Sequence, residues 1–434
     1  MGNTVGIVGG GAAGMMAAIT AARRGGKVTL LEGNDRLGKK ILSTGNGKCN
    51  LGNESLGTAD YYTGRPDMLE EFLGRFGTAD TVSFFRGIGL MTKSRGGYLY
   101  PACEQAAAVL DVLRYEVKAA GVEVVTDFKA ESVRRGRRAK LFEVHGTGGI
   151  RSFDRIILAC GGKAAPKTGS DGSGYRIAEQ LGHSLVPTVP ALVQLRCREE
   201  YLKAVAGVRA EAQISVYFQG KRMAQERGEL QLTEYGVSGI PVFQLSRTVN
   251  YILAGGRRVL ESRPSGGCRN PERGNVTEKD IKIVIDFLPE VTEEEFKTLY
   301  RERMLLQGQR TVEEFFTGML HKKLMLLFIK LAGLKPGEAA GQADERKLKR
   351  VFELCRSLTL HVIGSNSYDN AQVCAGGVPL EEVTGELESK LVPGLYFAGE
   401  LLDVDGRCGG YNLQWAWCSG FIAGCGAVGL SLKK

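Results

Sequence analysis

A glycine-rich turn near the N-terminus is the first feature that could bind an anion. The stretch VGIVGGGAAGMMAA (residues 5–18) contains the spacing GxGxxG. In this spacing Gly9 permits a tight turn, Gly11 lets the backbone approach a pyrophosphate, and Gly14 lets a helix pack on the preceding strand. The N-terminus of that helix stabilises the negative charge. A signal-peptide core is excluded because the charged residues follow the apolar run, and a glycine-rich core turn remains the alternative to a phosphate cradle.

The elements around this turn follow the order that a dinucleotide site requires. Thr4–Val8 is an apolar, β-branched run suited to a buried parallel strand, and residues 12–24 have the composition of a helix. A second strand, Lys27–Leu31, ends at Glu32, 18 residues after Gly14. This spacing is close to the roughly 20 residues expected before an acid that binds a ribose hydroxyl. Strand, turn, helix and acid together predict a Rossmann-like dinucleotide site.

The C-terminal region favours FAD over a nicotinamide dinucleotide. Residues 394–417 read GLYFAGELLDVDGRCGGYNLQWAW, in which a strand (Leu395–Ala398) ends in Gly-Glu and a helix opens near Asn412. Such an arrangement suits the ribityl chain and the electron-rich pyrimidine edge of a reduced flavin. A further element, RIILACGG (residues 155–162), has the form that closes over the nucleotide in two-dinucleotide flavoproteins. The pattern predicts an FAD site assembled from both ends of the chain.

Composition and charge narrow the class of protein. The 434 residues, 43% hydrophobic and 24% charged, suit a globular protein of two or three domains. Single, scattered cysteines and only four histidines argue against a zinc site or a disulfide framework and favour a reducing cytoplasm. The net charge of +9 favours anionic partners, but no aromatic residues interleave the basic clusters, which we therefore expect to be solvated faces. The uncharged segment Ala416–Leu432 is interrupted by glycines and predicts a buried helix, not a membrane span.

Longer motifs make nearly the whole chain resemble one family of bacterial flavoproteins. The motifs are LGKKILSTGNGKCNLGN (37–53), TGSDGSGYRIAEQLGH (168–183), LTEYGVSGIP (232–241), CAGGVPLEEV (374–383) and GGYNLQWAW (409–417). The family is that of the YhiN-like, BaiN-like and aminoacetone oxidase-like NAD(P)/FAD-dependent oxidoreductases. The resemblance implies an α/β fold, with an FAD domain of the two-dinucleotide-binding type interrupted by an inserted β-barrel that carries a small helical insert.

Sequence periodicity supports this layout. Residues 192–259 contain short alternating stretches that predict antiparallel strands, and Thr292 precedes three glutamates as a helix N-cap. Further helices are expected within 311–331 and 345–357, and residues 264–271 are interpreted as a linker. The predicted domains are 1–190 (FAD-binding domain, first part), 191–270 (β-barrel, first part), 271–345 (helical insert), 346–370 (return through the barrel) and 371–434 (FAD-binding domain, second part).

The resemblance also assigns cofactor-binding roles to particular residues. It implies that the glycine-rich turn holds the pyrophosphate, that Glu32 binds the adenosine ribose, and that Lys39 or Lys40 neutralises a phosphate. Glu400 and Asp403 are expected near the ribityl chain. The full expected set is Gly9, Gly11, Ala12, Ala13, Gly14, Glu32, Gly33, Lys39, Lys40, Ser43, Gly45, Asn46, Gly47, Cys49, Asn50, Ala130, Ala159, Gly161, Gly399, Glu400, Asp403, Gly410, Asn412 and Leu413.

The sequence identifies no catalytic acid or base. Cys49 lacks the second cysteine of the C-x4-C pair that flavin disulfide reductases place against the flavin, so we expect it to be packed or at the flavin edge. Tyr235, His361 and Tyr411 are candidates for proton donors, although an isolated Tyr or His is more often structural. No metal site is expected.

These features predict an FAD-dependent oxidoreductase. We expect it to accept reducing equivalents from NAD(P)H and to pass them to a small organic acceptor such as an activated C=C bond. Two alternatives stay open: an oxygen-using amine or alcohol oxidase, and an RNA-associated flavoprotein, which the pI near 9.0 and the basic helical insert suggest. We expect a cytoplasmic protein with a small-molecule substrate, and neither a membrane, a nucleic acid nor an obligate protein as partner in the favoured interpretation.

Overall fold

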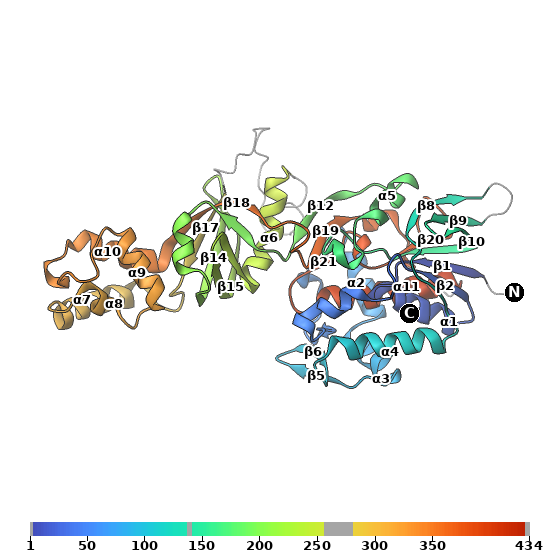
Figure 1. The fold of residues 1–434 in the computed structure, drawn as a ribbon, viewed down its shortest axis with the longest axis horizontal. Helices are drawn as coiled ribbons and strands as arrows, with labels where there is room; N and C mark the ends of the chain where they lie inside the picture. The colour runs from blue at the N-terminus through green and yellow to red at the C-terminus, as the bar shows by residue number, and fades with distance from the viewer. Residues whose placement is uncertain (1–2, 137–140, 256–280, 430–434) are drawn as a thin grey trace. The chain divides into compact units, whose positions relative to one another are not determined.

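The computed structural model describes residues 3–136, 141–255 and 281–429, which form two compact units (Figure 1). Unit 1 comprises Met1–Pro190 and Tyr368–Lys434, and unit 2 comprises Ala191–Ser367. The linker expected at 264–271 lies outside the described residues.

A five-stranded parallel sheet forms the centre of unit 1, in the order β20-β11-β1-β2-β7. Its strands are β1 (Thr4–Val8), β2 (Lys27–Leu31), β7 (Glu123–Val125), β11 (Arg155–Leu158) and β20 (Leu395–Phe397). The central strand β1 is buried from Val5 onward, as expected for an apolar run inside a parallel sheet. Because β20 comes from the C-terminal part of the chain, this sheet joins its two ends. The predicted Rossmann-like α/β fold is confirmed.

Helices α1 (Ala12–Arg23) and α11 (Tyr411–Ala427) pack closely because glycines of α11 face the backbone of α1. A Cβ at Gly420 would lie 2.4 Å from the carbonyl oxygen of Ala13, and one at Gly424 would lie 2.7 Å from that of Ala17. Small residues therefore set the distance between these helices. Most of α11 is buried, which confirms the buried helix expected in this region. Among the described helices, none is long and apolar enough to cross a membrane.

The other elements of unit 1 surround this core. Three antiparallel sheets of the described residues consist of β8 (Ala130–Arg135), β9 (Phe142–Gly146) and β10 (Gly149–Phe153); of β3 (Gly52–Asn53), β5 (Thr92–Arg95) and β6 (Tyr98–Pro101); and of β4 (Tyr61–Tyr62) and β21 (Asp405–Gly406). A further two-stranded sheet consists of β12 (Val186–Ala191) and β19 (Val373–Gly377). The helices are α2 (Pro66–Arg75), α3 (Thr78–Gly87), α4 (Ala106–Ala119) and α5 (Ser173–Gln180).

A closed antiparallel barrel forms the first part of unit 2, in the order β13-β16-β15-β14-β17-β18. Its strands are β13 (Leu195–Cys197), β14 (Arg209–Phe218), β15 (Lys221–Thr233), β16 (Gly236–Gly239), β17 (Ile281–Asp286) and β18 (Leu358–Ser365), and α6 (Ile240–Leu253) packs against β15. Ile281, Ile283 and Ile285 are fully buried and alternate with the less buried Lys282, Val284 and Asp286, which is the period-2 pattern of a strand with one core face. The inserted β-barrel is therefore present. Strand β17 lies within the 271–345 segment expected as the helical insert, but it belongs to the barrel. All six of its residues pair with β14, and four of them also pair with β18.

The part of unit 2 that the structure describes also contains helices α7 to α10 (Figure 1). Helix α7 (Glu293–Gln307) begins at Thr292, whose hydroxyl accepts from the backbone N–H of Glu295, as the sequence predicts. The region 311–331 forms α8 (Val312–Phe316) and α9 (Lys322–Leu331), which are separated because Gly318 has a φ of +87°. Helix α10 (Glu345–Ser357) has the predicted bounds, although most of it lies in the 346–370 segment expected to return through the barrel.

Candidate functional site

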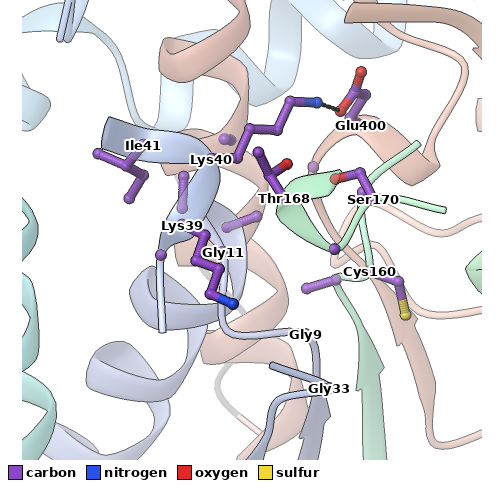
Figure 2. Close-up of a pocket in the computed structure, with 18 of the residues that line it drawn as sticks. Gly9, Gly11, Gly33, Lys39, Lys40, Ile41, Cys160, Thr168, Ser170 and Glu400 are labelled. Carbon is purple, nitrogen blue, oxygen red and sulfur yellow. Dashed lines mark hydrogen bonds and ion pairs between the residues drawn. The ribbon is translucent and has the colours of Figure 1, made fainter. Parts of the chain in front are cut away.

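A cavity of about 390 Å³ lies at the carboxyl ends of β1, β2 and β11 in unit 1 (Figure 2). This is the edge at which open parallel sheets bind ligands. Fifteen of the 24 expected cofactor residues line it: Gly9, Gly11, Ala12, Ala13, Glu32, Gly33, Lys39, Lys40, Ala130, Ala159, Gly161, Gly399, Glu400, Asn412 and Leu413. Residues from both ends of the chain are thus brought to one wall. Within the described residues, no group of three or more His, Cys, Asp or Glu side chains could hold a metal ion.

The N-terminus of α1 forms an open cradle in this wall. Gly11 is the N-cap, no side chain caps the helix, and its first turn contains no acid, so backbone N–H groups are free for an anion. A Cβ on Gly11 would meet nothing within 4 Å. By contrast, a Cβ on Gly9 (φ +105°) would lie 2.5 Å from the carbonyl oxygen of Ala159, and one on Gly14 would lie 1.8 Å from that of Gly9. Gly9 and Gly14 are therefore required by packing, whereas Gly11 leaves space for a ligand.

Glu32 is held in place by backbone and amide donors. Its side chain is buried, with Oε2 accepting from the N–H of Gly10 at 2.8 Å and Oε1 accepting from the N–H (2.8 Å) and Nδ2 (2.6 Å) of Asn34. Oε1 thus has two donors and Oε2 has one, so Oε2 can accept a further hydrogen bond, which suits a ribose hydroxyl. Asn34 also donates to the carbonyl of Thr168 at 3.3 Å, a contact that the sequence did not predict.

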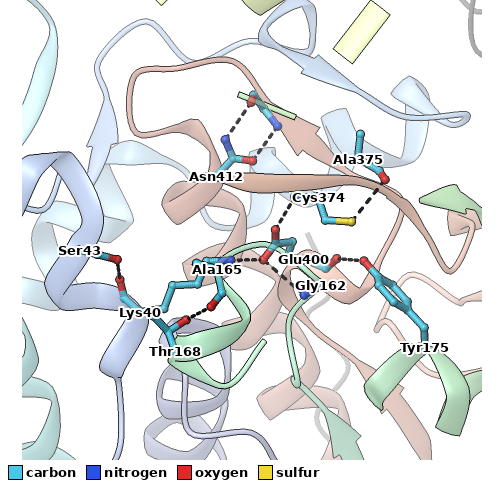
Figure 3. A network of polar contacts seen from close by, with 11 residues as sticks. Lys40, Ser43, Gly162, Ala165, Thr168, Tyr175, Cys374, Ala375, Glu400 and Asn412 are labelled. Carbon is cyan, nitrogen blue, oxygen red and sulfur yellow. Dashed lines mark hydrogen bonds and ion pairs between the residues drawn. The ribbon is translucent and has the colours of Figure 1, made fainter. Parts of the chain in front are cut away.

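Lys40 and Glu400 form an ion pair that joins the two halves of the site (Figure 3). Lys40 Nζ lies 2.8 Å from Glu400 Oε2, while Glu400 Oε1 accepts from the backbone N–H of Cys374 at 2.6 Å. Tyr175 donates its hydroxyl to the backbone carbonyl of Glu400 at 3.2 Å. Lys39 instead pairs with Asp35 at 2.7 Å. Both lysines are near the cradle, and each already has an acidic partner.

The sequence analysis missed the contacts that span the cavity beside Glu32. Lys129, in the loop before β8, pairs with Asp171, in the loop before α5, at 2.6 Å, and both residues line the cavity. Burial raises the pKa of Asp171, but hydrogen bonds from Lys129 and Ser173 outweigh it and lower the pKa to about 2. The motif TGSDGSGY contains Asp171 and is one of the motifs that resemble the family. The motif does not indicate that Asp171 pairs with Lys129.

The remaining expected residues lie outside the cavity wall. They are Gly14, Ser43, Gly45, Asn46, Gly47, Cys49, Asn50, Asp403 and Gly410. Thr44 of the same loop does line the cavity, and left-handed backbone at Gly45, Asn46 and Cys49 turns the loop sharply. Cys49 is fully buried, and burial raises the pKa of its thiol to about 11 despite a hydrogen bond with Thr44. Burial and a raised thiol pKa are typical of a packing residue.

None of the three proton-donor candidates lines the cavity. Tyr235 and His361 belong to unit 2, where the Tyr235 hydroxyl accepts from Nδ2 of Asn366 at 3.1 Å and His361 Nδ1 lies 2.7 Å from Glu199. Tyr411 begins α11, and burial together with nearby Asp60 raises its pKa. Each therefore has a local structural partner, and their catalytic role remains a hypothesis.

A buried triad in unit 1 resembles a hydrolase site without being one. His183 Nδ1 lies 2.6 Å from Glu382, and its Nε2 lies 2.8 Å from the hydroxyl of Ser389. Ser389 is only 3% exposed, and its oxygen also accepts the backbone N–H groups of Leu391 and Val392. A nucleophile needs access to its substrate, so this triad serves to hold the loop between β19 and β20.

The chain matches known proteins along most of its length. The family model described as HI0933-like protein Rossmann domain matches residues 3–426. A relative from Clostridium scindens named 3-dehydro-bile acid delta(4,6)-reductase is 41% identical over 429 residues, which cover 98% of this chain and 99% of the relative. A relative from Haemophilus influenzae named ribosomal RNA dihydrouridine synthase is 28% identical over 437 residues, which cover 99% and 98%. The solved 3-ketosteroid delta1-dehydrogenase from Sterolibacterium denitrificans aligns with 98% of this chain and 99% of its own, at 13% identity and a TM-score of 0.49.

Proposed function

This chain belongs to the HI0933-like Rossmann-domain family, and from that premise we propose that it is an FAD-dependent reductase of C=C bonds conjugated to a carbonyl group. The chain is an oxidoreductase, as the sequence predicts. The C. scindens relative, whose alignment covers 98% of this chain and 99% of the relative, is named a reductase. The observation that carries the FAD assignment is the uncapped N-terminus of α1 with open space at Gly11, beside the buried carboxylate of Glu32.

The residues of the cavity fit the parts of FAD. The α1 N-terminus would hold the pyrophosphate and Glu32 the adenosine ribose. The N-terminus of α11 is also uncapped, and Asn412 and Leu413 in its first turn line the cavity, where they would face the pyrimidine edge of the flavin. Glu400, held by Lys40, would lie beside the ribityl chain.

The acceptor class follows from the chemistry of the relative and of the cofactor. The C. scindens relative is named for reduction of 3-dehydro bile acids. Once reduced by its electron donor, bound FAD would supply a hydride, which requires an electron-poor carbon as acceptor. A carbonyl group conjugated to the C=C bond makes its far carbon electron-poor. We therefore infer an enone or a related small molecule as acceptor, and NAD(P)H as the source of reducing equivalents.

An anaerobic titration tests this function. The FAD-loaded protein is titrated with NADPH and then NADH while the visible flavin band is followed, and a cyclic enone is added to the reduced protein. We expect bleaching by one donor and stoichiometric reoxidation by the enone. Reoxidation by oxygen but not by enones would move the assignment to an oxidase. Purified protein that takes up no FAD would refute the proposal.

A second candidate function is reduction of uracil in RNA. The H. influenzae relative, which spans 99% of this chain, is named ribosomal RNA dihydrouridine synthase. The C5=C6 bond of uracil is conjugated to the C4 carbonyl, so it is an electron-poor double bond of the same kind as an enone. Incubation of the reduced protein with uridine-containing RNA would add two hydrogens per uridine converted, which mass spectrometry of the digested RNA detects.

A cytoplasmic location is supported by the state of the thiols. Within the described residues, free thiols are found at Cys49, Cys103, Cys160, Cys197, Cys355, Cys374, Cys418 and Cys425. Free thiols, several of them buried, are typical of a reducing compartment.

A further inference from the structure

Positive charge is concentrated in one segment of unit 2. Residues 322–350, which we call the basic segment, contain eight Lys and Arg against three Asp and Glu, a net charge of +5, while the whole chain carries +9. All eight cations are exposed: Lys322, Lys323, Lys330, Lys335, Arg346, Lys347, Lys349 and Arg350. Exposed positive charge at this density attracts polyanions.

Neighbouring acids neutralise few of these cations. Three of them form ion pairs with glutamates at 2.7 to 3.1 Å, and such exposed pairs are weak enough to be displaced. Lys347 Nζ donates at 3.1 Å to a backbone carbonyl just after α9, which joins the end of α9 to the start of α10. The cations that form no ion pair with any described residue are Lys323, Lys330, Lys335, Arg346 and Lys347.

A groove between α7 and α10 brings aromatic rings beside the basic segment. Its volume is about 800 Å³, and Phe296, Tyr300 and Phe352 line it. Lys349 Nζ lies 5.8 Å from the centre of the Tyr300 ring, and the guanidinium carbon of Arg356 lies 5.6 Å from that of Phe296. Cations interact with ring faces at these distances. Ring faces and the cations of α10 thus share one groove.

The groove also offers hydrogen-bond acceptors. Asp286, Glu293, Glu345 and Glu353 line it together with Lys297, Arg301, Lys349 and Arg356. The buried Nε of Arg356 has no hydrogen-bond partner among the described residues, and Asp286 lies 3.8 Å away. The four acids and four cations give the lining no net charge, so the groove does not select a simple anion, whereas a nucleobase presents a flat ring with both donors and acceptors.

We propose that the basic segment and the α7–α10 groove form one docking site for single-stranded RNA, with a base stacked in the groove and phosphates along the basic segment. Aromatic platforms beside a cationic track are the recurring means of binding single strands. The inference rests on the second candidate function, to which it adds the surface that holds the RNA. An acidic lipid headgroup would bind the cations of the basic segment but would not stack on the aromatic rings of the groove. The test below distinguishes these two ligands.

The test measures RNA binding by the FAD-loaded, full-length protein. The probe is a fluorescent oligouridine of about 20 nucleotides, followed by anisotropy. With about five phosphate contacts, the single-strand slope of log affinity against log salt is about −3.5, so affinity falls about 100-fold between about 50 and 200 mM salt. No binding at about 50 mM salt would overturn the proposal.

Paired variants locate the surface. The double variant Lys330→Gln, Arg346→Gln is expected to weaken RNA binding and to reduce the slope of log affinity against log salt by about 1.4. The control double variant Arg86→Gln, Lys118→Gln makes an equal charge change on exposed residues of unit 1 and is expected to leave the affinity and the slope unchanged. Tyr300→Leu is expected to weaken binding about tenfold at every salt concentration, while Tyr300→Phe, which keeps the ring, binds normally. Equal effects of both double variants would overturn the proposal, and an unchanged Tyr300→Leu variant would exclude stacking and leave a headgroup-type contact.

Activity separates this proposal from the function on which it rests. Enone reduction by the Lys330→Gln, Arg346→Gln protein is expected to equal that of the wild type. If RNA binds through this surface and its uridines are not reduced, the docking site stands and the second candidate function fails. If uridines are reduced while none of these variants alters binding, the function stands and the docking site is wrong.

Discussion

Replacement of Gly11 by alanine is expected to remove FAD without unfolding the protein. Gly11 is the N-cap of α1, with φ −79° and ψ −166°, a conformation that alanine adopts without strain. Its added methyl group would meet no atom of the protein within 4 Å and would occupy the cradle. The apoprotein is therefore expected to lose at most about 1 kcal/mol of stability through the poorer N-cap.

The loss of FAD affinity can be estimated from the hydrogen bonds at the cradle. A hydrogen bond to a charged group contributes about 1.5–3 kcal/mol. Displacement of the pyrophosphate from one or two backbone N–H groups would therefore cost about 2–4 kcal/mol, which weakens binding about 30- to 1,000-fold.

Quenching of flavin fluorescence on titration of the apoprotein measures the dissociation constant. Gly74→Ala on α2 is the matched control, because a Cβ there also meets nothing within 4 Å and Gly74 does not line the cavity. Gly14→Ala provides the contrast: its Cβ would lie 1.8 Å from the Gly9 carbonyl, so that variant is expected to lose stability itself. Normal FAD binding by folded Gly11→Ala protein would refute the placement of the pyrophosphate at α1.

Three further predictions address other parts of unit 1. Glu32→Gln is expected to weaken FAD binding about tenfold in the same titration, because a ribose hydroxyl bonds more strongly to a carboxylate than to an amide; unchanged affinity would contradict the ribose role. Burial raises the pKa of Glu382, but hydrogen bonds from Ser184 and His183 outweigh it and hold the pKa below 4.5, so the stability that this carboxylate contributes is present above pH 4.5 and is lost as the pH falls further. Glu382→Gln should therefore lower the free energy of unfolding in urea by about 1–3 kcal/mol near pH 7, a deficit that shrinks below pH 4.5, and a deficit independent of pH would argue against the charge. Iodoacetamide should alkylate exposed Cys103 in the native protein and spare buried Cys49, as peptide mass mapping would report; rapid reaction at Cys49 would reopen a thiol role at the site.

The sequence was sufficient wherever a structure depends on neighbouring residues. Strand β1, helix α1 and strand β2 were predicted nearly to the residue, because β-branched runs and helical composition act over a few positions. The same holds for the predicted N-cap Thr292, whose hydroxyl accepts from a backbone N–H three residues away. The family motifs also indicated that both ends of the chain build one domain, although they contain no distances.

Only the tertiary structure decided which distant residues meet. Lys129 and Asp171 pair across the cavity, and no local pattern links residues so far apart in sequence. Strand β17 joined the barrel because its backbone found partners in β14 and β18, which periodicity in one segment cannot report. In the sequence no aromatic residues interleave the basic clusters, yet folding brings Tyr300 of α7 beside Lys349 of α10. Local propensities act along the chain, whereas sites arise from hydrogen bonds, charges and packing between segments that only the folded chain brings together.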